Sequence, residues 1–193
     1  MVPSRSKTTA SAPFAAAHAG TIDTPVAATT LIVVGVARSL ARHGVRVTAI
    51  ANAHHDPAHV AALRAAADDV AGDGGAIIAF PDLTRRRWAE RLTDEFRSGA
   101  CHAGRYEGSV ILAVRPDLVR EDVLARLAPN PRSLVDAIRS GDRTFAAAGG
   151  PDAYFGFPAE ATAEEGRRTI ETLGAILEES VLEAMNASAA GNP

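Results

Sequence analysis

Two histidines and an aspartate directly follow the first predicted strand of the chain. Residues 45–51 form a short apolar run with β-branched members, which predicts a buried strand. His54, His55 and Asp56 come at its carboxyl end, the edge at which open α/β sheets bind their ligands. Adjacent side chains on an extended backbone point in opposite directions, so at most one imidazole is expected to face a pocket. The alternative is a polar turn before the helix that Pro57 begins.

His102 and Glu107 lie in a second segment, residues 99–109, which glycines interrupt. A His-Ala-Gly sequence bounded by glycine has no packing reason to contain histidine, whereas Glu107 could also cap a helix. Cys101 beside His102 raises the alternative of a Cys–His nucleophile pair, although neighbouring side chains seldom face each other. We expect this segment and the His54 loop to meet at one sheet edge, forming a pocket with metal-ligand chemistry.

Helices and strands alternate in the first half of the sequence. This order predicts an α/β fold with a mostly parallel sheet flanked by helices. The predicted elements are a helix over 25–43, strands over 45–51 and 76–80, and helices over 57–71 and 85–96. A last helix begins after Thr162, and its apolar stripe is expected to face the sheet. Two visible strands leave sheet edges bare, so either residues 101–155 contain more strands or a partner chain covers the sheet.

The bulk composition predicts one globular domain and excludes several classes of partner. At 193 residues and 47% hydrophobic, the chain suits a single domain over residues 20–187, with poorly ordered tails at 1–19 and 188–193. A net charge of −3 gives no reason to expect nucleic acid or an anionic membrane as partner. The run Arg85-Arg86-Arg87 is expected to be a solvated face rather than a phosphate site. A single cysteine excludes internal disulfides and suits the cytoplasm.

Short motifs along residues 13–185 occur in an order that resembles the creatininase family, also called creatinine amidohydrolases. They are Gly20-Thr21-Ile22, Asn52-Ala53-His54-His55-Asp56, His102-Ala103-Gly104 with Glu107-Gly108-Ser109, Pro116-Asp117-Leu118-Val119, and Glu165-Gly166-Arg167-Arg168. The resemblance implies a creatininase-like fold and metal-dependent hydrolysis of the C–N bond of a small amide or lactam, or the reverse ring closure.

The resemblance also implies roles for individual residues. His54, Asp56 and Glu107 match positions that bind a divalent metal ion, zinc or manganese. His102 matches the loop histidine that transfers protons near the substrate, and Glu107 is a second candidate for that catalysis. Imidazole and carboxylate suit this chemistry because both bind such ions and both can carry a proton.

The sequence departs from the family pattern in its metal shell. Family members carry a Glu-x-His-Gly segment upstream, and the 193 residues contain no Glu-x-His. We therefore expect the chain to be N-terminally shortened relative to the family, with an incomplete metal site. It would be a subunit of a homo- or hetero-oligomer that borrows ligands from a longer creatininase-like chain. The alternative is a non-catalytic subunit that scaffolds or completes such a partner.

Overall fold

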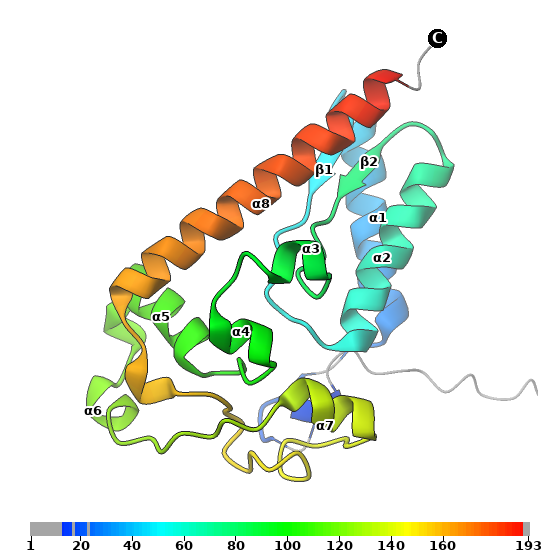
Figure 1. Ribbon diagram of the computed structural model, residues 1–193. Coiled ribbons are helices and arrows are strands. Elements are labelled where there is room, and N and C mark those ends of the chain that lie inside the picture. The colour runs from blue at the N-terminus through cyan, green and yellow to red at the C-terminus, as the bar shows by residue number, and fades with distance from the viewer. Residues whose placement is uncertain (1–12, 17, 23, 191–193) are drawn as a thin grey trace, which may run out of the picture. The chain divides into compact units, whose positions relative to one another are not determined.

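The computed structural model describes residues 13–16, 18–22 and 24–190 (Figure 1). The chain divides into two compact units. Unit 1 comprises residues 1–13, 20–84 and 175–193, and unit 2 comprises residues 14–19 and 85–174. Whether both belong to the single domain predicted over 20–187 stays a prediction, and the predicted tails lie largely outside the described residues.

Unit 1 contains the alternating elements that the sequence predicts. They are α1 (Val26–Arg42), β1 (Val47–Ala49), α2 (Pro57–Gly72) and β2 (Ile77–Ala79). The two strands run parallel, with Val47 opposite Ile77 (Figure 1). Both strands are shorter than predicted, although Ile50 still donates to the Ala79 carbonyl at 2.9 Å. The fold is α/β with a small parallel sheet, as the sequence predicts.

The core of unit 1 forms where α1 and α2 pack together. Val34 and Ala37 of α1 and Ala66 and Val70 of α2 are buried around Ile78 of β2. Alanines at the contact let the two helices approach closely, which explains why alanine-rich sequences form this pair. The packing fixes the position from which the His54 loop leaves β1.

Unit 2 is helical and carries the second predicted site segment. Its elements are α3 (Arg86–Ala89), α4 (Asp94–Ser98), α5 (Arg105–Val114), α6 (Glu121–Leu124), α7 (Leu134–Ser140) and the 3₁₀ turns η2 (Pro116–Leu118) and η3 (Pro158–Glu160). The 3₁₀ turn η1 (Pro13–Ala15) belongs to unit 2 from Phe14 on. The last helix, α8 (Ala163–Ala190), belongs to unit 2 up to Gly174 and to unit 1 from Ala175.

Several elements of unit 2 differ from the prediction. The single helix predicted over 85–96 is two helices, because the Thr93 hydroxyl accepts a hydrogen bond from the Phe96 N–H and begins α4. The segment predicted as a loop over 99–109 is helical from Arg105. Residues 101–155 contain no further strand, so the sheet of the described residues has two strands. Only an isolated bridge joins Asn130 to Gly156.

Aromatic side chains form the core of unit 2. Phe145 and the fully buried Phe155 pack with Phe14, Ala100 and Ala148. Phe14 lies in η1, within the stretch 1–19 that the sequence predicts to be a poorly ordered tail.

The last helix begins as predicted but buries its apolar stripe only in part. The Thr162 hydroxyl accepts from the Glu165 N–H at 3.2 Å, which caps the helix. Ile176 is completely buried, whereas Ile170 and Leu182 of the predicted stripe are exposed. Among the described residues, no helix is both long and apolar enough to cross a membrane.

Candidate functional site

The His54 loop connects β1 to α2, and an asparagine side chain fixes its backbone. The Asn52 amide donates to the His54 carbonyl at 2.7 Å, and its oxygen accepts from the His54 N–H at 3.3 Å. The same oxygen lies 3.1 Å from Nε2 of His59, in the first turn of α2. The His54 side chain is itself exposed. The loop backbone is therefore held while the His54 ring stays open to solvent.

Asp56 begins the helix that follows the loop. One of its carboxylate oxygens accepts a hydrogen bond from the Ala58 N–H at 2.8 Å, and Pro57 occupies the first helical position. The carboxylate thus has a structural role as the N-cap of α2. The second carboxylate oxygen of Asp56 has lone pairs with which it could coordinate a metal ion.

The imidazoles of the loop differ in their surroundings. Burial, with the nearby His54 adding to it, lowers the pKa of His55 to about 4, while Asp82 opposes that shift. Burial also lowers the pKa of His59, whose ring centroid lies 5.1 Å from that of His54. His55 is therefore neutral at pH 7. The expectation that the adjacent histidines differ in orientation agrees with an exposed His54 and a partly buried His55.

His102 lies in unit 2, in the turn that precedes α5. Its Nδ1 lies 2.7 Å from the carbonyl oxygen of Ala153, and its ring centroid lies 4.5 Å from that of Phe145. Its backbone carbonyl accepts from the Phe155 N–H at 2.7 Å. Packing, a side-chain hydrogen bond and a backbone hydrogen bond therefore fix this imidazole together.

Glu107 occupies the first turn of α5 and folds back over the start of that helix. Its carboxylate accepts from the Ala103 N–H at 2.7 Å, and Ala103 has a φ of 50°. This is the capping alternative that the sequence left open. The contact uses one oxygen, so the role in metal binding stays a prediction.

Glu95 is a buried carboxylate that sequence reasoning missed. It is 3% exposed and accepts hydrogen bonds from the backbone N–H groups of Arg105, Tyr106 and Phe157. It lies at the N-terminus of α5, where the helix dipole favours an anion. Gly156 has a φ of 91°, and a side chain there would meet the carboxylate. Glu95 therefore holds the start of α5, and with it the turn that contains His102.

Cys101 does not have the character of a nucleophile. Burial, with the nearby carboxylates of Glu107 and Glu95 adding to it, raises the pKa of its thiol to about 12. A thiol needs a lowered pKa to act as a nucleophile at neutral pH. The structure gives no support to the Cys–His alternative.

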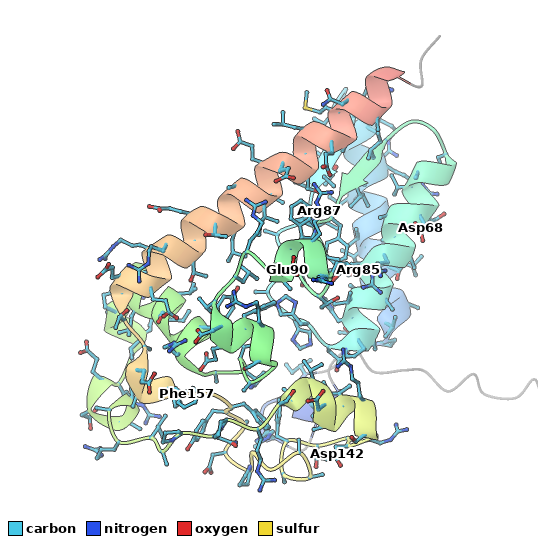
Figure 2. The ribbon with its side chains drawn as sticks, in the orientation of Figure 1. Asp68, Arg85, Arg87, Glu90, Asp142 and Phe157 are labelled. Carbon is cyan, nitrogen blue, oxygen red and sulfur yellow. The ribbon has the colours of Figure 1, made fainter. Side chains whose placement is uncertain are left out.

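The arginine run and a surface hollow are formed by residues that are not among the predicted site residues. Arg85, Arg86 and Arg87 are all exposed. Figure 2 shows Arg85 and Arg87 beside α3. Arg86 pairs with Glu90 at 2.6 Å, and the Arg87 guanidinium lies 4.0 Å from the Trp88 ring centroid. A hollow of about 280 Å³ in unit 2 is lined by Arg91, Leu92, Thr93, Asp94, Glu165, Arg168, Thr169 and Thr172.

The predicted metal ligands fit a divalent ion in type but not in number. A catalytic zinc ion takes three protein ligands and a water molecule. Among residues 13–16, 18–22 and 24–190, no three His, Cys, Asp or Glu side chains are grouped to hold an ion. His54 and Asp56 belong to unit 1 and Glu107 to unit 2. Their convergence on one ion stays a prediction.

Comparison with known proteins adds a family to this geometry. The family model described as creatininase, creatinine amidohydrolase, matches residues 7–181. The chain belongs to the creatininase family. Creatininases are metal-dependent amidohydrolases that act on small-molecule amides. No curated protein matches the sequence.

Solved structures of creatininase mutants share the fold. A mutant with phenylalanine in place of a tryptophan is 23% identical, with a TM-score of 0.55 over 86% of this chain and 67% of its own. A glutamate-to-glutamine mutant described as Zn–Zn type is 22% identical, with a TM-score of 0.55 over 86% of this chain and 66% of its own. A third, complexed with creatine, is 21% identical, with a TM-score of 0.52 over 85% and 67%. The chain thus spans about two thirds of the length of these creatininases.

Proposed function

We propose that this protein is a creatininase-like subunit that acts in hydrolysis of the C–N bond of a small amide or lactam, or in the reverse ring closure. In this proposal His54, Asp56 and Glu107 contribute ligands to a zinc or manganese ion, and His102 transfers the proton. The main support is the fixed imidazole of His102, which Ala153 and Phe145 hold in a chain of this family.

His102 has the hydrogen bonding that a general base requires. A carbonyl oxygen can only accept a hydrogen bond, so Nδ1 of His102 carries the proton that points at Ala153. In the neutral ring Nε2 then keeps its lone pair, and it has no hydrogen-bond partner among the described residues. In hydrolysis the water oxygen bonds to the carbonyl carbon, the C–N bond breaks, and a water proton moves to the leaving nitrogen. Nε2 would take up that proton and release it in the same cycle.

The metal site would require ligands from another chain. The exposed His54 ring would be one of the ligands of a divalent ion. When bound, such an ion lowers the pKa of its water molecule. The types of the three predicted ligands suit zinc or manganese, while a three-ligand cluster is missing from the described residues. We infer that a partner creatininase-like chain completes the shell. A homo-oligomer and a hetero-oligomer are both compatible with this proposal.

A second candidate function is that of a non-catalytic subunit that binds a full-length homologue. The two-stranded parallel sheet favours it, because parallel sheets are normally larger and covered on both sides. Each strand has one edge without a neighbouring strand among the described residues. Natural proteins seldom leave such edges bare. A strand from the partner could pair with one of them.

Metal analysis of the purified chain separates the two candidates. The chain would be isolated alone and with any creatininase-like homologue that co-purifies, and its zinc and manganese content measured by mass spectrometry. The catalytic proposal expects stoichiometric metal that His54→Ala removes and that the control His43→Ala retains, since His43 is an exposed residue at the end of α1. Metal that His54→Ala does not change contradicts it. A metal-free but stable hetero-oligomer, detected by native mass spectrometry, supports the second candidate.

A further inference from the structure

The tautomer of His102 depends on one carbonyl group of a loop far along the chain. Nδ1 faces the Ala153 oxygen at 2.7 Å, across 51 positions of sequence. If that carbonyl turned away, Nδ1 would lose its acceptor, and the ring could move its proton to Nε2. Such a ring could not accept a proton at Nε2. The direction of the Ala153 carbonyl therefore decides whether His102 can act as a base at that atom.

The backbone at Ala153 needs support to hold this direction. Ala153 has a φ of 60°, in the left-handed region that a residue with a side chain enters only at an energetic cost. Its own N–H donates to the Gly150 carbonyl at 2.9 Å. A left-handed alanine persists only where surrounding contacts hold it.

Asn130 supplies those contacts from outside the loop. Its side-chain amide donates to the carbonyls of Gly149, at 3.2 Å, and Tyr154, at 3.0 Å. Its backbone exchanges two hydrogen bonds with Gly156, of 2.8 and 2.6 Å. These contacts fall on both sides of Ala153. Asn130 therefore closes the 149–156 loop with four hydrogen bonds.

Further contacts restrict what the loop can do. The Tyr154 hydroxyl donates to the Ala128 carbonyl at 3.0 Å, and Phe155 is completely buried. Phe145 packs against both Phe155 and the His102 ring. The loop is thus held both by the hydrogen bonds of Asn130 and by the packing of Phe155 in the aromatic core of unit 2.

We propose that the 149–156 loop, tied by Asn130, positions His102 by presenting the Ala153 carbonyl to Nδ1, so that Nε2 is kept as the proton acceptor. Asn130 and Ala153 are positioning residues, because they act through His102 and not on the substrate. The inference rests on the proposed function, in which His102 transfers the proton.

The test is the tautomer of His102, measured by ¹⁵N–¹H correlation spectroscopy of the histidine-labelled full chain at a pH where the ring is neutral. The His102 signals are assigned by their loss in His102→Gln. The wild-type ring is expected to be mainly protonated at Nδ1, in contrast to the exposed His43. A wild-type His102 protonated mainly at Nε2 overturns the proposal, and this result needs no variant.

Substitutions at Asn130 then test whether its hydrogen bonds hold the 149–156 loop. Asn130→Asp keeps the size of the side chain but replaces its donor with an acceptor that repels the two carbonyls, and Asn130→Ala removes the donor. In both, the Nδ1-protonated share is expected to fall towards that of His43. The control Ser133→Ala removes the cap of α7, whose hydroxyl accepts from the Asp136 N–H at 3.1 Å, and should leave the tautomer unchanged. An unchanged tautomer in the folded Asn130 variants overturns the proposal.

A second variant covers the case in which the Asn130 variants do not fold. Ala153→Gly retains the hydrogen bonds of Asn130 and removes the side chain that disfavours the left-handed conformation, so the Nδ1-protonated share is expected to stay at or above that of the wild type. A share that falls in this variant contradicts the proposal, because the Asn130 hydrogen bonds would then not hold the direction of the Ala153 carbonyl. The tautomer is measured without substrate or turnover. An inactive protein with the expected tautomer would therefore contradict the proposed function and leave this inference standing.

Discussion

The His54 loop of unit 1 and the His102 turn of unit 2 place a histidine before a helix, but they fix it in different ways. Before α2, hydrogen bonds from Asn52 hold the backbone of His54 and leave its ring exposed. Before α5, the His102 ring is itself held, by the Ala153 carbonyl and by Phe145. A proton-transfer group benefits from a ring that is positioned in advance. A metal-ligating histidine is normally oriented as well, by a hydrogen bond from its second ring nitrogen. The contrast therefore favours the role proposed for His102 more strongly than the ligand role proposed for His54.

The largest expected effect comes from breaking the support of the His102 turn. Glu95→Ala removes the acceptor of three backbone N–H groups in a buried place and should lower the free energy of unfolding by at least about 3 kcal/mol. Urea unfolding monitored by circular dichroism measures it. Glu90→Ala is the control, because it removes only the exposed pair with Arg86, and such surface pairs contribute little to stability. Similar losses in the two variants would show that Glu95 does not hold the turn.

A smaller effect is expected in the His54 loop, where Asp56 has a structural and a proposed chemical role. Asp56→Ala removes the N-cap of α2 and should lower the free energy of unfolding by about 1 kcal/mol. Asp56→Asn keeps a good cap and should change stability by only a few tenths of a kcal/mol. Since an amide is a poorer ligand than a carboxylate, the Asn variant should still lose metal. Full metal content in a stable Asp56→Asn protein would remove Asp56 from the proposed site.

The smallest effect concerns Cys101, next to the fixed histidine. Its thiol has a pKa raised to about 12 by burial, above the ordinary value of about 8.5. A raised pKa keeps the group neutral as pH rises, so alkylation of the folded protein by iodoacetamide should stay slow from pH 7 to about 9. The same thiol should react readily in urea, which serves as the control. A rate that increases around pH 8.5 in the folded protein would indicate an ordinary, accessible thiol.

Local sequence signals were sufficient for the elements of unit 1. Asp56 and Pro57 mark the start of α2, and the apolar run after Gly44 marks β1, because capping and periodicity act over a few residues. The start of α5 could not be predicted in this way. It depends on Glu95, ten positions before Arg105, and on Phe157, whose N–H donates to the same carboxylate from 62 positions further along the chain.

In the candidate site too, local sequence signals were sufficient for some features, whereas others depend on residues far apart in the sequence. The residue types at positions 54, 56, 102 and 107 indicated the chemistry, and the capping role of Glu107 was among the alternatives. The partner of His102 was out of reach, since Ala153 is a left-handed alanine that no local rule predicts. Asn130 lies between two prolines, and that setting indicates a constrained turn but not what the turn holds.

Gly166, near the beginning of α8, has a packing role that is independent of the proposed chemistry. A methyl group there would lie 1.9 Å from the Ser109 carbonyl oxygen, so any other amino acid would force α5 and the beginning of α8 apart. The residue touches none of the groups proposed for chemistry. The contact between α5 and the beginning of α8 therefore requires glycine at this position whether or not a metal ion is bound elsewhere. Replacing Gly166 would test the packing of the two helices and not the chemistry.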